Sequence, residues 1–259
     1  MDTFLGIDLA WAERNDSGVA ALRAADGGLE VLDLGVARGL QAVLAWVDAR
    51  LCSPPAAGGR VICMVDAPLM VPNDSGGRPC EREVARAFGA NHAAPYPANR
   101  RLLGRYRPDG RPVGEVLGEE LAARGFEWPP RRLRTRLGAR SRIVQECYPH
   151  PAHVRLFALA RTLPYKKKQG RTWQSVRAAF AAYVHGMRDL RGPQLIWTPA
   201  LDARFDATTL RGVAYKRAED QLDALCCAYI AALLPRGRLE GFGEGASGMI
   251  VVPLTRASS

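Results

Sequence analysis

The order of short apolar segments before residue 66 most constrains the fold of this chain. Three strand-like segments come first, then one helix, then a run that is apolar throughout. The expected elements are strands at residues 3–9, 18–22 and 29–34, a helix at 39–51 and a strand at 61–65. The last run, VICMV, is typical of a strand that is covered on both faces. Short turns, such as Asp26-Gly27-Gly28, predict that the first three strands form a meander.

The segment at about 67–142 differs in character, because it is rich in proline and glycine and its basic residues are all arginine. We interpret it as an insertion with short helices at residues 81–88 and 113–124. The elements expected after it are a strand at 143–148, helices at 152–160, 173–190 and 218–234, and a closing strand at 249–254.

This order predicts a single α/β domain over residues 1–259. Its mixed sheet would join an antiparallel three-strand meander to parallel strands, with helices on both faces and the arginine-rich insertion at about 67–142. The arrangement resembles the ribonuclease H-like fold.

Charge and composition narrow the class of protein. A net charge of +10 favours a polyanionic partner such as DNA or RNA. Only four of the 36 basic residues are lysine, so the arginine bias is equally explained by the coding composition of the source genome. No run approaches the roughly 20 apolar residues of a spanning helix, so we expect a cytoplasmic protein without a membrane partner. The oligomeric state stays open.

Four aspartates lie at positions that are typical of catalytic or metal-binding residues. Asp8 ends the first strand, Asp66 ends the VICMV strand, and Asp220 and Asp223 lie one turn apart on the late helix. An ionised carboxylate in such apolar surroundings is costly unless a cation neutralises it. Carboxylate oxygens suit Mg²⁺ or Mn²⁺, and two such ions can activate a water and stabilise the leaving oxygen of a phosphodiester.

Several motifs, taken in order, carry a family resemblance. They are GIDLAW at 6–11, VDAPL at 65–69, RPCERE at 78–83, YPAN at 96–99, ECYPH at 146–150, EDQLDALCCAY at 219–229 and MIVVP at 249–253. Together they resemble a bacterial and archaeal family, domain of unknown function 429, which is described as predicted nucleases of ribonuclease H-like fold.

A more distant resemblance is to the RuvC-like resolvases. In those proteins an aspartate on the first strand, an acid on the fourth strand and a D-x-x-D-A-L helix build the metal site. Asp8, Asp66, Asp220 and Asp223 match that pattern. The resolvases carry glutamate where this chain has Asp66, and the shorter side chain would draw the metal closer to the backbone.

Further candidate residues have two interpretations each. Glu146 could be a ligand or general base, or could pair with an arginine. His150 and His153 could be proton shuttles or packed residues. The candidate nucleic-acid contacts, which could equally be a solvated face, are Arg78, Arg82, Arg100, Arg101, Lys166, Lys167, Lys168 and Lys216.

We therefore expect a metal-dependent nuclease that hydrolyses DNA or RNA. Its catalytic residues would be Asp8, Asp66, Glu146, Asp220 and Asp223, and Asp8, Asp66 and Asp223 would hold the metal. Two alternatives remain. One is a nucleic-acid-binding protein of the same fold without turnover. The other is an actin-like or sugar-kinase-type phosphotransferase, since GIDLA resembles the first phosphate loop of those proteins.

Overall fold

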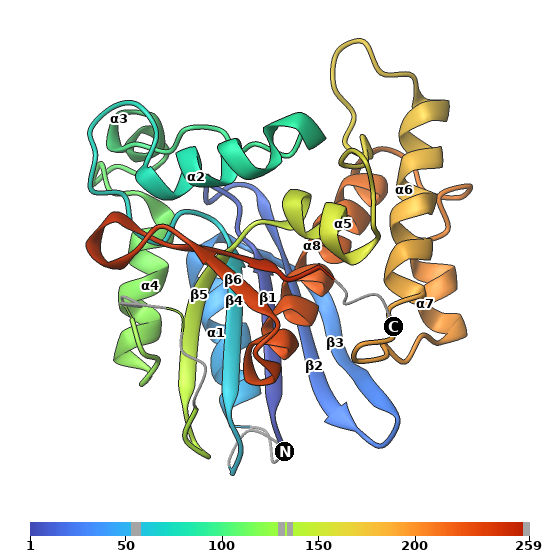
Figure 1. Cartoon of the computed structure of the whole chain (residues 1–259), viewed down its shortest axis with the longest axis horizontal. Helices are drawn as coiled ribbons and strands as arrows, with labels where there is room; N and C mark the ends of the chain where they lie inside the picture. The colour runs from blue at the N-terminus through green and yellow to red at the C-terminus, as the bar shows by residue number, and fades with distance from the viewer. Residues whose placement is uncertain (53–57, 129–132, 134–136, 256–259) are drawn as a thin grey trace.

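The chain folds around one mixed sheet. The computed structural model describes residues 1–52, 58–128, 133 and 137–255. Within them the strands lie in the order β3-β2-β1-β4-β5-β7-β6, and helices pack on the sheet (Figure 1). This confirms the expected α/β fold with a mixed sheet.

The pairing of the strands shows an antiparallel part, a parallel part and a closing hairpin. β1 pairs antiparallel with β2, and β2 with β3, while β1, β4, β5 and β7 are parallel neighbours and β6 is antiparallel to β7. The bounds are β1 Thr3–Asp8, β2 Asp16–Ala25, β3 Gly28–Arg38, β4 Val61–Asp66, β5 Arg142–Cys147, β6 Leu239–Phe242 and β7 Ile250–Pro253.

Helices occupy most of the chain between and after these strands. Their bounds are α1 Gly39–Leu51, α2 Pro79–Phe88, α3 Arg100–Leu103, α4 Val113–Ala123, α5 Pro149–Leu156, α6 Trp173–Arg188, α7 Pro199–Arg204 and α8 Gly212–Leu233. Short 3-10 turns lie at η1 Gly89–Asn91, η2 Gly104–Tyr106, η3 Leu234–Arg236 and η4 Gly245–Ser247. None of the helices among the described residues is long and apolar enough to cross a membrane.

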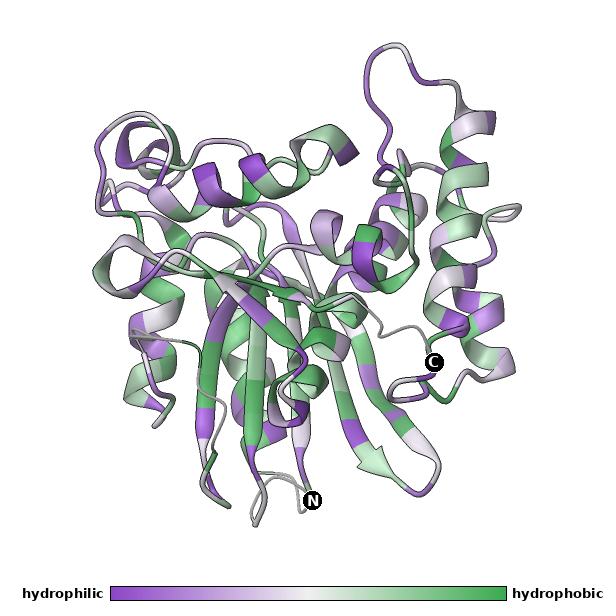
Figure 2. Cartoon of the chain, viewed as in Figure 1, coloured by the Kyte–Doolittle hydropathy of each residue, from purple (hydrophilic) through white to green (hydrophobic). Residues whose placement is uncertain are grey.

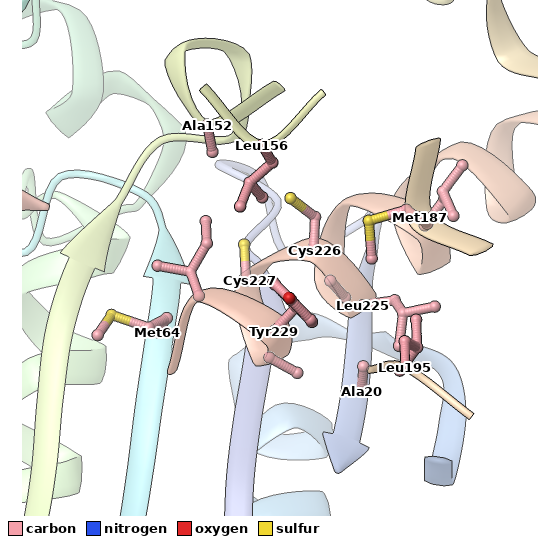
Figure 3. Close-up of a cluster of buried hydrophobic side chains, with 14 of the residues drawn as sticks. Ala20, Met64, Ala152, Leu156, Met187, Leu195, Leu225, Cys226, Cys227 and Tyr229 are labelled. Carbon is pink, nitrogen blue, oxygen red and sulfur yellow. The ribbon is translucent and has the colours of Figure 1, made fainter. Parts of the chain in front are cut away.

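Both faces of the sheet are covered because successive strand side chains point to opposite sides. Phe4 of β1 belongs to a core under α5, α6 and α8, whereas Leu5 belongs to a second core under α1 and α4. The central strands and α8 are accordingly apolar along most of their length (Figure 2). Figure 3 shows Cys226 and Cys227 of α8 within the first core, near Met64 of β4.

Helix α8 lies unusually close to β1 and β2. A Cβ atom on Gly6 would stand 2.0 Å from the carbonyl oxygen of Ala224, and one on Gly18 would stand 1.9 Å from that of Asp220. Both distances are far below van der Waals contact, so these positions admit only glycine with the helix where it is. Glycine within a strand commonly marks such a close backbone approach.

Most of the expected elements are confirmed, with differences at the ends. Helix α8 begins at Gly212, six residues before the predicted start, and α5 begins at Pro149 rather than 152. Three short elements were missed: α3, α7 and β6. The interpretation of residues 67–142 as an insertion stays a prediction, although α4 within it packs into the core on the α1 face.

Candidate active site

The two strand-end aspartates lie side by side. Asp8 and Asp66 are direct partners in the parallel ladder of β1 and β4, whose carboxyl ends share one edge of the sheet. Neighbouring strands lie about 4.8 Å apart, and side chains in register on parallel strands point to the same face. That face is the one under α8, because Phe4 and Met64, an even number of residues before, pack there.

Helix α8 brings the third carboxylate over the same strand ends. Asp223 is completely buried, and its Oδ1 accepts a hydrogen bond of 2.6 Å from the Tyr165 hydroxyl. Its Oδ2 lies 2.8 Å from Nζ of Lys166. Tyr165 and Lys166 come from the segment between α5 and α6, so four distant parts of the chain meet here: β1, β4, this segment and α8.

Charges in this cluster act strongly on one another. Burial, and then repulsion by Asp223 and Asp66, raises the pKa of Asp8 well above its ordinary value, although Lys166 opposes the rise. Burial likewise raises the pKa of Asp66 to about 7 against the opposing effect of Lys166. Burial also acts on Asp223, but Lys166 and Tyr165 outweigh it and hold the pKa of Asp223 below its usual value.

Lys166 is the cation that the carboxylates share. Burial lowers the pKa of its amine, but attraction to Asp223, Asp8 and Asp66 raises that pKa well above the ordinary lysine value. The side chain is 31% exposed, so the ammonium reaches solvent as well as the acids. The sequence predicted Lys166 as a nucleic-acid contact, and the structure additionally shows it as the partner of the acid cluster.

Asp220 lies one turn before Asp223 on α8. It pairs with Lys216 one turn earlier on α8, and with Lys216 it lines a cleft of about 420 Å³. Asp8 and Lys166 line this cleft too. Repulsion from Asp220 still contributes to the raised pKa of Asp8, so the fourth acid belongs to the electrostatic site.

Glu146 of β5 is paired with a buried arginine. Its two carboxylate oxygens accept hydrogen bonds of 2.8 Å and 2.6 Å from Arg78, and Oε2 also accepts one from the Leu69 amide. Arg78 is 1% exposed and also bonds Glu81 at 2.8 Å and the carbonyl of Met70 at 2.9 Å. Of the two interpretations of Glu146, the arginine pair is the one found.

This pair corrects the predicted role of Arg78 and bears on that of Glu146. Four hydrogen bonds inside the protein occupy the Arg78 guanidinium, so Arg78 is a buried structural residue and does not follow a nucleic-acid backbone. Both oxygens of Glu146 likewise accept hydrogen bonds from Arg78, and a catalytic role for Glu146 stays a prediction.

A cleft of about 290 Å³ opens over the strand ends. The charged and aromatic side chains that line it include Asp8, Trp11, Asp66, Arg78, Tyr96, Glu146, Tyr148, His150, Lys166 and Lys168. His150 has its Nδ1 3.0 Å from the Tyr148 hydroxyl, and burial, with Lys166 nearby, lowers its pKa to about 4. A neutral imidazole therefore faces the carboxylate cluster.

His153 lies in the core rather than in the cleft. Its ring is fully buried, with its centre 4.0 Å from that of Tyr183, and burial lowers its pKa to about 3. Of its two interpretations, the packed residue is the one found. The tight aromatic packing leaves it no route to a substrate.

The remaining predicted nucleic-acid contacts are exposed but differ in position. Lys168 lines the main cleft and Lys216 the adjacent one, whereas Arg100 pairs with Glu115 at 3.0 Å. Those that line none of these clefts are Arg82, Arg100, Arg101 and Lys167. Four insertion arginines, Arg131, Arg132, Arg134 and Arg136, lie outside the described residues.

The donor set has the chemistry of a site for a hard cation. Asp8 and Asp66 offer oxygen ligands from adjacent strand ends, and Mg²⁺ typically binds through one or two carboxylates and retains several waters. Burial, and then repulsion among the acids, raises the pKa of both aspartates, and a bound dication would favour their ionised forms. In the described part of the chain, no three side chains of His, Cys, Asp or Glu are placed to hold one ion together.

Comparison with known proteins assigns the chain to a family. Residues 6–246 match the family described as protein of unknown function (DUF429), and the chain belongs to it. This confirms the resemblance seen in the motifs. No match to the chain was found among curated proteins or among solved structures.

Proposed function

We propose that this member of the DUF429 family is a metal-dependent nuclease that hydrolyses phosphodiester bonds of DNA or RNA. The observation that carries the proposal is the convergence of three acids: Asp8 and Asp66 line one cleft from neighbouring strand ends, and Asp223 of α8 is buried close enough to raise the pKa of both. Isolated structural carboxylates rarely gather in this way, because their mutual repulsion is costly.

The topology supports a ribonuclease H-like fold for this site. An antiparallel meander, β3-β2-β1, continues into the parallel strands β4 and β5, as in the arrangement that the sequence resembles. In that arrangement the acids on the first and fourth strands and on a late helix form the catalytic centre. The corresponding positions here are Asp8, Asp66 and Asp223.

Each residue has a task that follows from its contacts. Asp8 and Asp66 would hold Mg²⁺ or Mn²⁺, which when bound supplies positive charge at the phosphate and lowers the pKa of water. Lys166 reaches both the acids and the open cleft, so its ammonium can bind a phosphate oxygen of the substrate. Tyr165 fixes the Asp223 carboxylate through its hydroxyl.

A cleavage assay tests the proposal. The full chain with Mn²⁺ or Mg²⁺ should cut single-stranded or duplex DNA or RNA, and EDTA should stop the cutting. Asp8→Asn should abolish cleavage and weaken Mn²⁺ binding measured by calorimetry. Asp26→Asn is the matched control. It removes the same charge, but at an exposed residue in the turn between β2 and β3. Cleavage that survives Asp8→Asn would refute the assignment.

One observation favours a second candidate, a nucleic-acid-binding protein without turnover. Lys166 already neutralises part of the acid cluster through its ion pair with Asp223, so the site tolerates its charge without a metal. Salt-sensitive binding of nucleic acid, together with no cleavage and no Mn²⁺ binding, would favour this candidate.

A further inference from the structure

Two exposed aromatic rings lie in the wall of the main cleft. Trp11 is 43% exposed and Tyr96 is 71% exposed, and both line the cleft that contains Asp8 and Asp66. Most aromatic residues of the chain are buried, Tyr165 among them. Large aromatic surfaces left in water beside a polar site are characteristic of places where a ligand packs.

Each ring contacts a neighbouring side chain and keeps part of its surface exposed. The ring of Trp11, three residues beyond Asp8, packs at a tilt against Tyr106, with centres 6.0 Å apart. Nζ of Lys168 lies 5.3 Å from the centre of the Tyr96 ring and donates to its hydroxyl at 3.3 Å. An aromatic face thus stands next to a cation, as in proteins that bind a base and its phosphate together.

Cationic side chains continue on both sides of the acids. The cleft next to Asp8 is lined by five cations and three carboxylates. Those cations are Arg14, Arg38, Lys166, Lys216 and Arg217. On the other side a smaller cleft of about 170 Å³ is lined by Lys166, Lys168 and Arg171 together with Tyr96. Lys166 lines all three clefts, so they adjoin one another at this residue and together offer a path across the strand ends.

We propose that this path binds a single strand of nucleic acid, with bases stacked on Trp11 and Tyr96. Its phosphates pass Lys168 on one side of Asp8 and Lys216 on the other. The location of the scissile phosphate rests on the proposed function, whereas the binding itself does not require cleavage.

The burial of the acids favours the binding of single-stranded nucleic acid over a duplex. Asp223 is fully buried, and Asp8 and Asp66 are half-buried at the base of the cleft, so a phosphate must enter it. A single strand can turn its bases outward onto the flanking rings, while a duplex keeps them paired and stacked on one another. Because every base has a π face, little preference for sequence is expected.

Binding of labelled oligonucleotides in EDTA tests this inference apart from cleavage. Fluorescence anisotropy would compare the full chain with single-stranded DNA, single-stranded RNA and a duplex of the same length. Single strands should bind at least about tenfold more tightly than the duplex. Trp11→Ala and Tyr96→Ala should each weaken single-strand binding by roughly 5- to 150-fold, the range for loss of one stacked base.

Matched variants separate stacking from other effects. Trp173→Ala is the control, because Trp173 is also 43% exposed but lines none of these clefts. Tyr96→Phe retains the ring without its hydroxyl and should recover most of the binding that Tyr96→Ala loses. Circular dichroism would establish that each variant is folded.

The outcomes distinguish this inference from the proposed function. Equal affinity for duplex and single strands, or unchanged binding by folded Trp11→Ala and Tyr96→Ala proteins, overturns the inference even if the chain cuts nucleic acid. Conversely, tight single-strand binding that depends on Trp11, without cleavage in Mn²⁺, supports the inference and removes the proposed function.

Discussion

Replacement of Arg78 by methionine should strongly destabilise the protein while leaving its surface unchanged. Arg78 is 1% exposed, and its guanidinium bonds two buried carboxylates, Glu81 and Glu146. Methionine retains much of the apolar stem and removes the charge. Glu81 keeps backbone donors from residues 78 and 98, but Glu146 keeps only the amide of Leu69. Most of the loss of stability should therefore come from the buried carboxylate of Glu146, which loses its counterion.

The size of the effect follows from the burial of the pair. Removing one partner of a buried ion pair costs about 3–5 kcal/mol, because the other charge stays in a poorly polarisable environment. In a chain of this size each kcal/mol lowers Tm by about 2–4 °C. We thus expect Arg78→Met to lower Tm by roughly 6–20 °C.

The loss of stability caused by Arg78→Met should depend on pH. Burial raises the pKa of Glu146, and Arg78 opposes that rise, so Arg78→Met should raise this pKa further. An acid whose folded pKa lies above its unfolded value, about 4.3, binds protons more tightly when folded. The free energy of unfolding therefore falls as the pH rises from the pKa of Glu146 in the unfolded chain to its pKa in the folded protein. The difference in unfolding free energy between Arg78→Met and the unchanged protein should grow from about pH 5 to pH 8.

Urea unfolding at several pH values measures this difference. Arg82→Met, in the helix α2 that begins just after Arg78, is the control. Arg82 is exposed, and substitutions at exposed positions usually change stability by no more than about 0.5 kcal/mol. Adding Glu146→Gln to Arg78→Met should recover a large part of the lost stability. A loss below about 1 kcal/mol, or one independent of pH, would refute the assignment of Arg78 as the essential counterion.

Three further predictions concern the acid cluster, the α8 contact and the histidine core. Lys166→Met removes the ammonium that competes with a cation for Asp223, so the Kd for Mn²⁺ by calorimetry should fall roughly tenfold, and a rise would contradict the shared-cation interpretation. Gly6→Ala should cost at least about 1–3 kcal/mol in urea unfolding, because its Cβ would lie 2.0 Å from a carbonyl of α8. Gly35→Ala, whose Cβ would have no neighbour nearer than 3.9 Å, should be far milder. His153 has a pKa lowered to about 3 by burial, so it supports stability above about pH 6.5 and loses it as pH falls. His153→Leu should therefore narrow the Tm difference between about pH 7.5 and pH 5, and an unchanged difference would show that another group causes the acid sensitivity.

The main elements of the sheet were predictable because each produces its own local pattern. VICMV is apolar throughout and is β4, and the DGG turn separates β2 from β3. The glycines of GIDLA and DSGVA also had a meaning that was not recognised, since Gly6 and Gly18 both lie against α8. β6 was missed because its four residues, LEGF, are too few to show a period.

Some residues of the candidate site were predictable from the local sequence, and others depend on contacts between distant segments. Asp8 and Asp66 were identifiable because strand ends in an α/β sheet are predictable places for functional groups. Nothing in the run Lys166, Lys167, Lys168 shows which lysine turns towards the acids, because the turn depends on the path between α5 and α6. The pairing of Arg78 with Glu146 likewise depends on tertiary structure over 68 residues.

The contact of α8 with β1 and β2 has a consequence for how the family can diversify. Main-chain atoms of the helix rest on Gly6 and Gly18, so the spacing between helix and sheet does not depend on the bulk of any side chain at these points. Substitutions at the exposed positions among residues 212–217, in the first turns of α8, can therefore alter recognition while Asp223 keeps its distance from the strand ends. Ligand preference and the geometry of the acids can evolve as separate traits.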